Sequence, residues 1–344
     1  MNYLYKYKHH LSIGLLVGGF IFDNIALRHA DFPLIKLALL GYLAFIGAGI
    51  LLFSVYNNQW LLLLIQFAFG NIFSGFFVLY FYSAPWVISW PFLVILFLIF
   101  LSSEFGKKHY LRFSFQLVIF YLALYSFLIL FLPILWGEIS ARIFLLSGVI
   151  SLAAMTGFLA LAARITPLLF DQAKSRLKWG IGGIFVLLNI FYFTNILPPI
   201  PLALKEAGVY HSIIHSGNNF SATAEKPTWW QSLNPYPTLH LAAGESAYVY
   251  GAVFAPTEIN TGIVHHWQYY NESEEAWVSQ SKIKMAIIGG REAGYRTYSF
   301  KINPAPGWWR VNIETGRGQV IGRQEFKVER IASDAILNLW TKKL

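Results

Sequence analysis

The stretch GIVHHWQYYN, Gly262 to Asn271, decides the fold of the C-terminal part of the chain, because its side chains alternate in character. On a β-strand, successive side chains point to opposite faces of the sheet. The two sets are Ile263, His265, Trp267 and Tyr269 on one face, and Val264, His266, Gln268 and Tyr270 on the other. The first set is the more apolar, so we expect it to face the core, with His265 as a buried structural histidine. His266 is then expected to face solvent or a partner.

The two adjacent histidines do not form a metal site by themselves, because side chains on opposite faces cannot both bind one ion. A zinc site would need further ligands from other strands. The upstream histidines His211, His215 and His240 show no spacing that links them to this stretch. The chain has no cysteine, which excludes disulfides and thiol ligands. We therefore expect no metal and no cofactor.

Segments with the same period-two pattern surround this stretch, separated by turn sequences such as NESEE and NPAPG. The expected strands cover residues 247–254, 262–270, 276–288, 295–302, 308–314 and 319–328. Short alternating strands at this spacing are typical of an immunoglobulin-like β-sandwich, which we expect at residues 245–330. Residues 331–344 are expected to form a short amphipathic helix that begins at Ser333, with Ile336, Leu337 and Trp340 on its apolar face.

The N-terminal part of the chain has long apolar runs and few charges. The whole chain is 56% hydrophobic and 12% charged, whereas an ordinary soluble domain carries about 25% charge. A membrane span needs about 20 mainly apolar residues, and seven runs approach or exceed this length. They cover residues 11–30, 32–55, 60–82, 84–101, 111–135, 141–163 and 180–200. We expect an α-helical multi-pass membrane domain at residues 1–204, in which the third and fourth runs form a helical hairpin or one broken helix.

The basic residues predict how the chain crosses the membrane, because cytoplasmic loops carry an excess of Lys and Arg. If the N-terminus is cytoplasmic, the inside loops contain Lys6, Lys8, Lys107, Lys108, Arg112, Arg164, Lys174, Arg176 and Lys178. The short outside loops contain only Arg28, Lys36 and Arg142. This bias predicts a bacterial inner-membrane protein with a cytoplasmic N-terminus and a periplasmic C-terminal domain. The net charge of +9 is then a topology signal and does not indicate nucleic-acid binding.

Residues 205–244, between the spans and the strands, are expected to form an irregular linker. They are rich in Gly, Asn, Ser and Pro and contain the pair Trp229 and Trp230. Aromatic side chains are enriched where a protein meets the membrane surface. The pair is interpreted either as an interfacial belt that contacts membrane lipids or as a pad between the soluble domain and the bilayer.

Three stretches of the C-terminal domain resemble those of a known bacterial family. They are VFAPTEINTGIVHHW (253–267), IGGREAGYRTYSFK (288–301) and GWWRVNIETGRGQVIGRQEF (307–326). Together they resemble a family of polytopic inner-membrane proteins with a C-terminal periplasmic β-domain, which is catalogued as a domain of unknown function. The similarity is strong over residues 249–328, although this chain has His266 where the family has a basic residue. The resemblance implies the architecture and implies no reaction. The alternation of the strands themselves predicts that Trp267 and Trp309 are structural residues.

Two kinds of polar residue are candidates for a site. In the β-domain, Arg291, Tyr295, Arg296 and Arg310 could bind an anionic glycan or a phosphate. The alternative is structural, because a guanidinium beside a tight turn often holds backbone carbonyls. Among the spans, the polar residues are Asp23, Gln66 and Asn71. An ionisable residue within a span is a functional-site hypothesis, but a local charge cluster at the membrane surface would also explain Asp23. Gln66 and Asn71 would form hydrogen bonds between helices.

The sequence contains no G-x-S-x-G, H-E-x-x-H or glycine-rich nucleotide motif. The favoured hypothesis is a non-enzymatic inner-membrane protein that presents the β-sandwich to a protein partner or a glycan, as a subunit or scaffold of an envelope assembly. Its expected contact residues are Trp229, Trp230, His266, Arg291, Tyr295, Arg296 and Arg310. The alternative is a transporter of small molecules or lipids whose site lies among the helices near Asp23.

Overall fold

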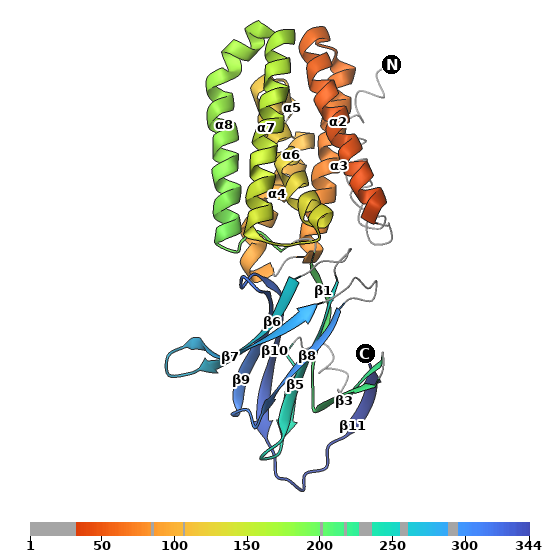
Figure 1. The fold of residues 1–344 in the computed structure, drawn as a ribbon, viewed down its shortest axis with the longest axis vertical. Helices are drawn as coiled ribbons and strands as arrows, with labels where there is room; N and C mark the ends of the chain where they lie inside the picture. The colour runs from red at the N-terminus through yellow and green to blue at the C-terminus, as the bar shows by residue number, and fades with distance from the viewer. Residues whose placement is uncertain are drawn as a thin grey trace. The chain divides into compact units, whose positions relative to one another are not determined.

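The computed structural model describes residues 32–83, 86–105, 107–199, 202–216, 219–226, 236–254, 261–287 and 295–344. The chain divides into two compact units, Met1–Leu197 and Pro198–Leu344. Helices form the first unit and strands form the second (Figure 1).

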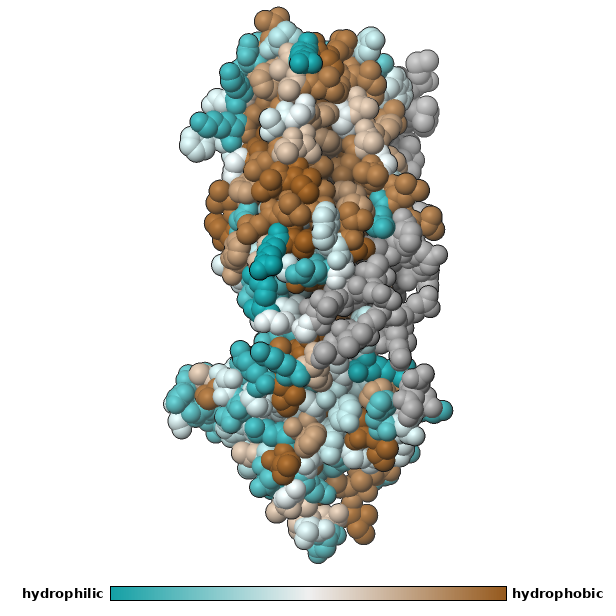
Figure 2. All heavy atoms as spheres, in the orientation of Figure 1, coloured by the Kyte–Doolittle hydropathy of each residue, from teal (hydrophilic) through white to brown (hydrophobic). Residues whose placement is uncertain are grey.

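The described helices are α2 (Phe32–Tyr56), α3 (Gln59–Ser83), α4 (Trp86–Phe105), α5 (Lys107–Tyr110), α6 (Phe113–Trp136), α7 (Ala141–Ile165) and α8 (Pro167–Phe193). Helix α6 is central, because it packs against α2, α3, α7 and α8 and is buried along most of its length. Apolar side chains cover much of the visible surface of this unit (Figure 2). A helix that is apolar on all sides is typical of a membrane span.

Within the described residues, five helices are long and apolar enough to cross a membrane, so the protein is an integral membrane protein. The predicted number of seven is corrected accordingly. The run at residues 11–30 lies outside the described residues. The fourth run forms α4, whose apolar stretch Ile88–Ser102 is shorter than a full span. Helices α3 and α4 are separate and pack against each other, as the hairpin interpretation expects.

The last span begins earlier than predicted, at Pro167 instead of residue 180, and ends at Phe193. Its first turns carry Asp171, Lys174, Arg176 and Lys178. These charges lower the local hydropathy, although lysine and arginine are good helix formers. Hydropathy therefore missed the start of the helix, while Pro167 occupies the first helical turn, where proline is well tolerated.

The strands of the second unit are β1 (Ala203–Tyr210), β2 (Ser212–Ser216), β3 (Asn219–Glu225), β4 (Thr238–Leu241), β5 (Ser246–Phe254), β6 (Thr261–Asn271), β7 (Ala276–Ile287), β8 (Tyr295–Ile302), β9 (Gly307–Thr315), β10 (Val320–Arg330) and β11 (Leu339–Lys343). They form three sheets with the orders β1-β5-β8, β4-β10-β9-β6-β7 and β11-β3-β2. The six strands predicted from the alternating pattern are β5 to β10. Strands β4 and β10 pair in parallel, whereas a plain antiparallel sandwich has no such pair.

Two expected segments differ from the structure. The predicted irregular linker at residues 205–244 contains most of β1 and all of β2, β3 and β4. The predicted C-terminal helix at residues 331–344 instead contains β11, which pairs with β3. Its supposed apolar face is not buried, since Ile336 is 99% exposed. The pairing with β3, which lies more than a hundred residues away in the chain, therefore outweighs the local helical pattern.

The sheet β1-β5-β8 is the middle layer of the β-domain. On one side, Ala247 and Val249 of β5 join a core with Trp267, Trp309 and other residues of the five-stranded sheet. On the other side, Tyr250 of β5 packs with residues of β2 and β3. Because both faces of β5 are covered, this strand is buried almost continuously. The third sheet thus extends the predicted two-layer packing to three layers.

A chain of hydrogen bonds inside the core joins the five-stranded sheet to the middle sheet and fixes the state of His265. Trp267 Nε1 donates to Ser299 Oγ (2.9 Å), and Thr297 Oγ1 donates to the carbonyl of Gly251 (3.0 Å). His265 Nε2 lies 3.0 Å from Thr297 Oγ1, and its Nδ1 lies 2.8 Å from Ser299 Oγ. Since the Thr297 hydrogen is already used, Nε2 donates, and Nδ1 accepts from Ser299. Burial lowers the pKa of His265 to about 4, so the ring is neutral at neutral pH.

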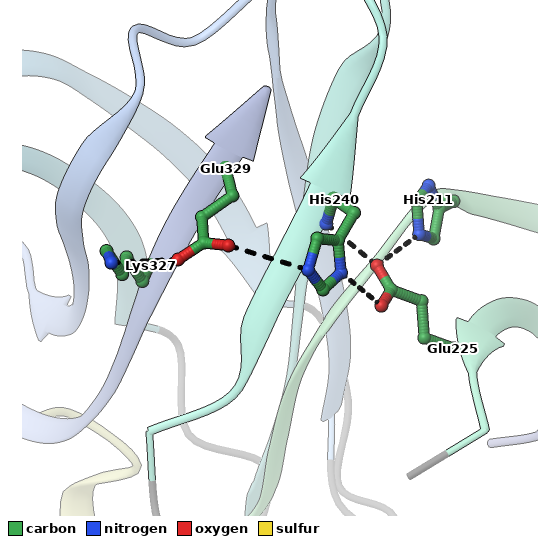
Figure 3. A network of polar contacts seen from close by, with 5 residues as sticks. All are labelled: His211, Glu225, His240, Lys327 and Glu329. Atoms are coloured by element: carbon green, nitrogen blue, oxygen red, sulfur yellow. Dashed lines mark hydrogen bonds and ion pairs between the residues drawn. The ribbon is translucent and has the colours of Figure 1, made fainter. Parts of the chain in front are cut away.

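A second polar network, centred on Glu225, connects β3 with β4 and β10 (Figure 3). Glu225 Oε1 lies 3.0 Å from Nε2 of His211 and accepts the backbone N–H of His240 (2.8 Å). Its Oε2 lies 2.7 Å from His240 Nδ1. His240 Nε2 lies 3.6 Å from Glu329, which pairs with Lys327. Burial acts to raise the pKa of Glu225, but the hydrogen bonds from both histidines outweigh it and hold the pKa below its ordinary value.

We expect Glu225→Ala to destabilise the β-domain by about 1–3 kcal/mol, because two imidazoles and a backbone N–H lose a partly buried acceptor. The free energy of unfolding can be measured by urea-dependent pulse proteolysis of the full-length protein in detergent. Glu329→Ala is the matched control, since its pair with Lys327 is largely exposed and surface ion pairs contribute little. Equal effects of the two substitutions would contradict the role assigned to Glu225.

Candidate functional site

The outer face of the five-stranded sheet carries most of the polar and aromatic side chains that are candidates for a site. In β9, Trp309, Val311 and Ile313 are buried, so the residues between them lie on the opposite face. Together with neighbours on β6, β7 and β10, the polar and aromatic side chains of this outer face include Trp308, Arg310, Asn312, Glu314, His266, Gln268, Tyr270, Trp277, Ser279, Arg323 and Glu325.

An open pocket of about 250 Å³ lies on this face. It is lined by Tyr236, Tyr270, Trp277, Trp308 and Glu325. The rings form two pairs: Tyr270 packs against Trp277 with centroids 5.3 Å apart, and Tyr236 meets Trp308 edge to face at 6.1 Å. Glu325 adds a carboxylate to these rings, so the pocket offers flat apolar surfaces beside a hydrogen-bond acceptor.

Arg310 is held next to this pocket by one aromatic ring and one hydrogen bond. The guanidinium lies 4.3 Å from the centroid of the Trp277 ring, and Nε donates to Gln268 Oε1 (2.6 Å). Burial, together with the nearby Arg323, lowers the pKa of Arg310 to about 10. The side chain therefore remains charged at neutral pH, and a cation over an indole face is an attractive arrangement.

His266 is buried on this face instead of facing solvent, which corrects the prediction from the sequence. It is 8% exposed. Its Nδ1 lies 2.9 Å from Glu314 Oε1, and its Nε2 lies 2.8 Å from Ser279 Oγ. Strand β9 supplies Glu314 and strand β7 supplies Ser279. The side chains of these two neighbouring strands cover the imidazole ring, which would be exposed if β6 stood alone.

The surrounding contacts show which nitrogen of the His266 ring carries a hydrogen. Glu314, 5% exposed, accepts a hydrogen bond from Asn312 Nδ2 (3.2 Å) as well as the contact with His266. Arg323 Nε donates to Asn312 Oδ1 (2.7 Å), which sets the orientation of that amide. A carboxylate only accepts hydrogen bonds, so Nδ1 of His266 carries a hydrogen. In the neutral ring, the lone pair of Nε2 then faces the hydroxyl of Ser279.

Four of the seven predicted contact residues lie in the described part of the chain, and of these four the structure brings His266 and Arg310 onto the same face of the sheet. Tyr295 is buried on β8 of the middle sheet. Arg296, also on β8, lies over the ring of Phe220 at 6.0 Å. The remaining three, Trp229, Trp230 and Arg291, lie outside the described residues. The binding roles of all seven stay predictions.

The residues predicted to be structural, His265, Trp267 and Trp309, are buried. Among the intramembrane candidates, Asp23 lies outside the described residues. Asn71 donates to the carbonyl of Phe67 in its own helix (2.8 Å), so this bond does not join two helices as expected. Gln66 is buried in α3, and its Nε2 has no hydrogen-bond partner within the part of the chain that the structure describes. In the same part, no group of three or more His, Cys, Asp or Glu could hold a metal ion.

Trp277, Ser279, Glu314 and the other lining residues of the pocket were not among the site residues predicted from the sequence. Their alternate positions on β7 and β9 place them on one face, which the period-two pattern does show. The pairing of β7, β6, β9 and β10 in one sheet is not visible in any single segment, and this pairing brings the side chains together.

Comparisons with known proteins give a family match for part of the chain. Residues 260–328 match the model of a protein of unknown function (DUF2914). No curated protein sequence matches the chain. The protein is thus a multi-pass membrane protein with a C-terminal β-domain that carries this match.

Several solved structures have partial similarity. An immunoglobulin-like protein from Pseudomonas aeruginosa is 10% identical, with 37% of this chain and 96% of that chain covered and a TM-score of 0.23. A β-glucosidase from Listeria innocua in complex with gluconolactone is 17% identical, with 35% and 17% covered and a TM-score of 0.20. The alkylpurine DNA glycosylase AlkC from Pseudomonas fluorescens is 10% identical, with 78% and 81% covered and a TM-score of 0.23. TM-scores this low do not establish a shared fold.

Proposed function

We propose that the protein is an inner-membrane glycan-binding protein whose β-domain contacts a sugar chain in the periplasm. The observation that carries this proposal is the pocket of four aromatic rings and one carboxylate beside Arg310. Ligand sites combine apolar and aromatic walls with a few well-placed polar groups.

The chemistry of the pocket suits a sugar better than a purely apolar ligand. The C–H faces of a pyranose ring can pack on Trp277 or Trp308, while its hydroxyls can donate to Glu325. The adjacent polar row, including Gln268 and Arg323, provides more donors and acceptors for a second ring.

The distribution of basic residues supports a periplasmic β-domain. Lys107, Lys108 and Arg112 lie between the ends of α4 and α6, and Arg164 lies near the turn between α7 and α8. These junctions fall on one side of the membrane if the helices alternate in direction, and basic residues favour the cytoplasmic side. The chain after α8 would then emerge on the opposite side.

We expect Trp277→Ala and Trp308→Ala each to weaken binding of an N-acetylglucosamine tetraose at least tenfold, because each removes a stacking surface worth roughly 1.5 kcal/mol. Binding can be measured by isothermal titration calorimetry with the full-length protein in detergent. Trp340→Ala is the matched control, because Trp340 is 44% exposed and lies on β11, in a different sheet. If neither this tetraose nor any member of a bacterial glycan array binds, while a stoichiometric protein co-purifies, the protein would instead be a subunit of an envelope assembly.

A further inference from the structure

We propose that Ser279, His266 and Glu314 form a nucleophilic triad that hydrolyses acyl esters carried by the bound sugar. The sugar part of this proposal rests on the proposed glycan-binding function, whereas the triad is independent of it. Ser279 comes from β7, His266 from β6 and Glu314 from β9.

The distances and the order of contacts match what nucleophilic catalysis needs. A serine becomes a nucleophile when a base within hydrogen-bond reach accepts its proton, and the base is oriented by a third group. Here His266 Nε2 lies 2.8 Å from Ser279 Oγ, and His266 Nδ1 lies 2.9 Å from Glu314 Oε1. Asn312 also donates to Glu314, so the acid that orients the imidazole is itself held in place.

The burial of the three side chains follows the same division of roles. The acid and the base are buried, with Glu314 5% and His266 8% exposed, while Ser279 is exposed to an incoming substrate. A β-bulge lies at this point, since Ser279 pairs with Gln268 and Ser281 with Trp267, which leaves Gln280 without a partner on β6. Bulges change the direction of side chains and are common beside active sites. Gln268 is the cross-strand partner of Ser279, and His266 lies two residues before Gln268 on β6. The bulge therefore accompanies a diagonal contact between Ser279 and His266.

The reaction that this arrangement supports is ester hydrolysis in two steps. Ser279 Oγ attacks the acyl carbon while its proton moves to His266 Nε2. The bond from the acyl carbon to the alcohol oxygen then breaks, and the alcohol leaves with the proton from His266. Water attacks the acyl-serine with His266 as base, releases the carboxylic acid and restores Ser279. The exposed Lys282, the cross-strand partner of His266, offers a positive charge to the oxyanion.

The location of the triad suggests the substrate class. Trp277, which lines the pocket, is two residues before Ser279 on the same strand and lies on the same face, because the bulge comes only after Ser279. A sugar held against Trp277 would therefore place a substituent such as an O-acetyl group near Ser279. We accordingly assign O-acylated sugars as the substrate class.

The test uses the full-length protein in detergent, with a fluorophosphonate probe and p-nitrophenyl acetate. We expect the probe to attach to Ser279, as identified by mass spectrometry of the tryptic peptide. Ser279→Ala and His266→Ala should each lower the rates of labelling and ester hydrolysis about 100-fold, which is typical for loss of a nucleophile–base pair. Ser281→Ala is the matched control, because it lies two residues away and pairs with the inward-facing Trp267. Ser279→Cys should keep ester hydrolysis and make it sensitive to iodoacetamide.

A second substrate tests the assigned substrate class independently of the triad. We expect release of acetate from an O-acetylated N-acetylglucosamine tetraose, and its loss in Ser279→Ala, while binding of the unmodified tetraose remains. Absence of labelling at Ser279 in the folded protein would overturn the triad. Hydrolysis of p-nitrophenyl acetate without acetate release from the sugar would overturn the substrate class. Failure of the unmodified tetraose to bind would count against the proposed glycan pocket and would not affect the labelling result.

Discussion

Trp267→Ala is expected to lower the free energy of unfolding of the β-domain by about 3–5 kcal/mol, the cost of removing a large aromatic side chain from a packed core. Trp267 is fully buried. Its ring meets the rings of Trp309 and Phe326 at centroid distances of 6.2 and 6.1 Å, and its Nε1 donates to Ser299. The substitution therefore leaves a cavity and also removes one bond of the chain that fixes His265.

This loss can be measured by urea-dependent pulse proteolysis of the full-length protein in detergent. Trp267→Phe should fall between the wild type and the alanine variant, because it keeps the ring contacts but has no Nε1 donor. Trp340→Ala serves as the control at an exposed tryptophan of the same domain. A destabilisation by Trp267→Ala no larger than that by Trp340→Ala would show that the core does not depend on Trp267.

The second large effect is a loss of stability in acid that originates at His265. Its pKa is about 4 in the folded protein, because of burial, against an ordinary value of 6.5. Between these values the unfolded chain binds more protons than the folded one, so stability rises with pH in this window. The contribution of His265 is complete above pH 6.5, is lost as pH falls towards 4, and amounts to roughly 3 kcal/mol.

The contribution of His265 can be separated from that of other groups with His265→Gln. A glutamine amide can donate to Thr297 and accept from Ser299, but it does not titrate in this range. We expect the variant to be less stable at pH 7, and its difference from the wild type to shrink by roughly 3 kcal/mol between pH 7 and pH 4. Pulse proteolysis with an acid-tolerant protease gives the free energy of unfolding of the variant and of the wild type at each pH. Parallel stability curves for the two proteins would mean that His265 does not cause the acid sensitivity.

Prediction from the sequence succeeded where one segment contains the whole signal. The alternation in residues 262–271 places His265 and Trp267 in the core, because the pleat of a strand fixes the side of each residue. Long apolar runs identify the membrane helices for the same reason, since a span needs a minimum length of apolar chain. The start of α8 was missed because charged residues at its beginning are compatible with a helix but not with a hydropathy threshold.

Prediction failed where pairing between distant segments decides the structure. Residues 331–344 resemble a helix locally, yet Leu339–Lys343 pair with β3 and close the third sheet. His266 was expected to be exposed, but strands β7 and β9 on either side of β6 cover it with Ser279 and Glu314. Partners 13 and 48 residues away in the chain are not visible in the pattern around the histidine.

Hydropathy and period-two alternation are local properties of the chain, so they were enough to predict the membrane helices, strands β5 to β10 and the buried face of β6. The third sheet, the aromatic pocket and the contacts of His266 with Ser279 and Glu314 became visible only in the folded chain. The physical reason is that side-chain distances across a sheet depend on strand order and register. Hydrogen bonds between distant segments set that order and register. The paired strands β3 and β11, for example, are more than a hundred residues apart in the chain.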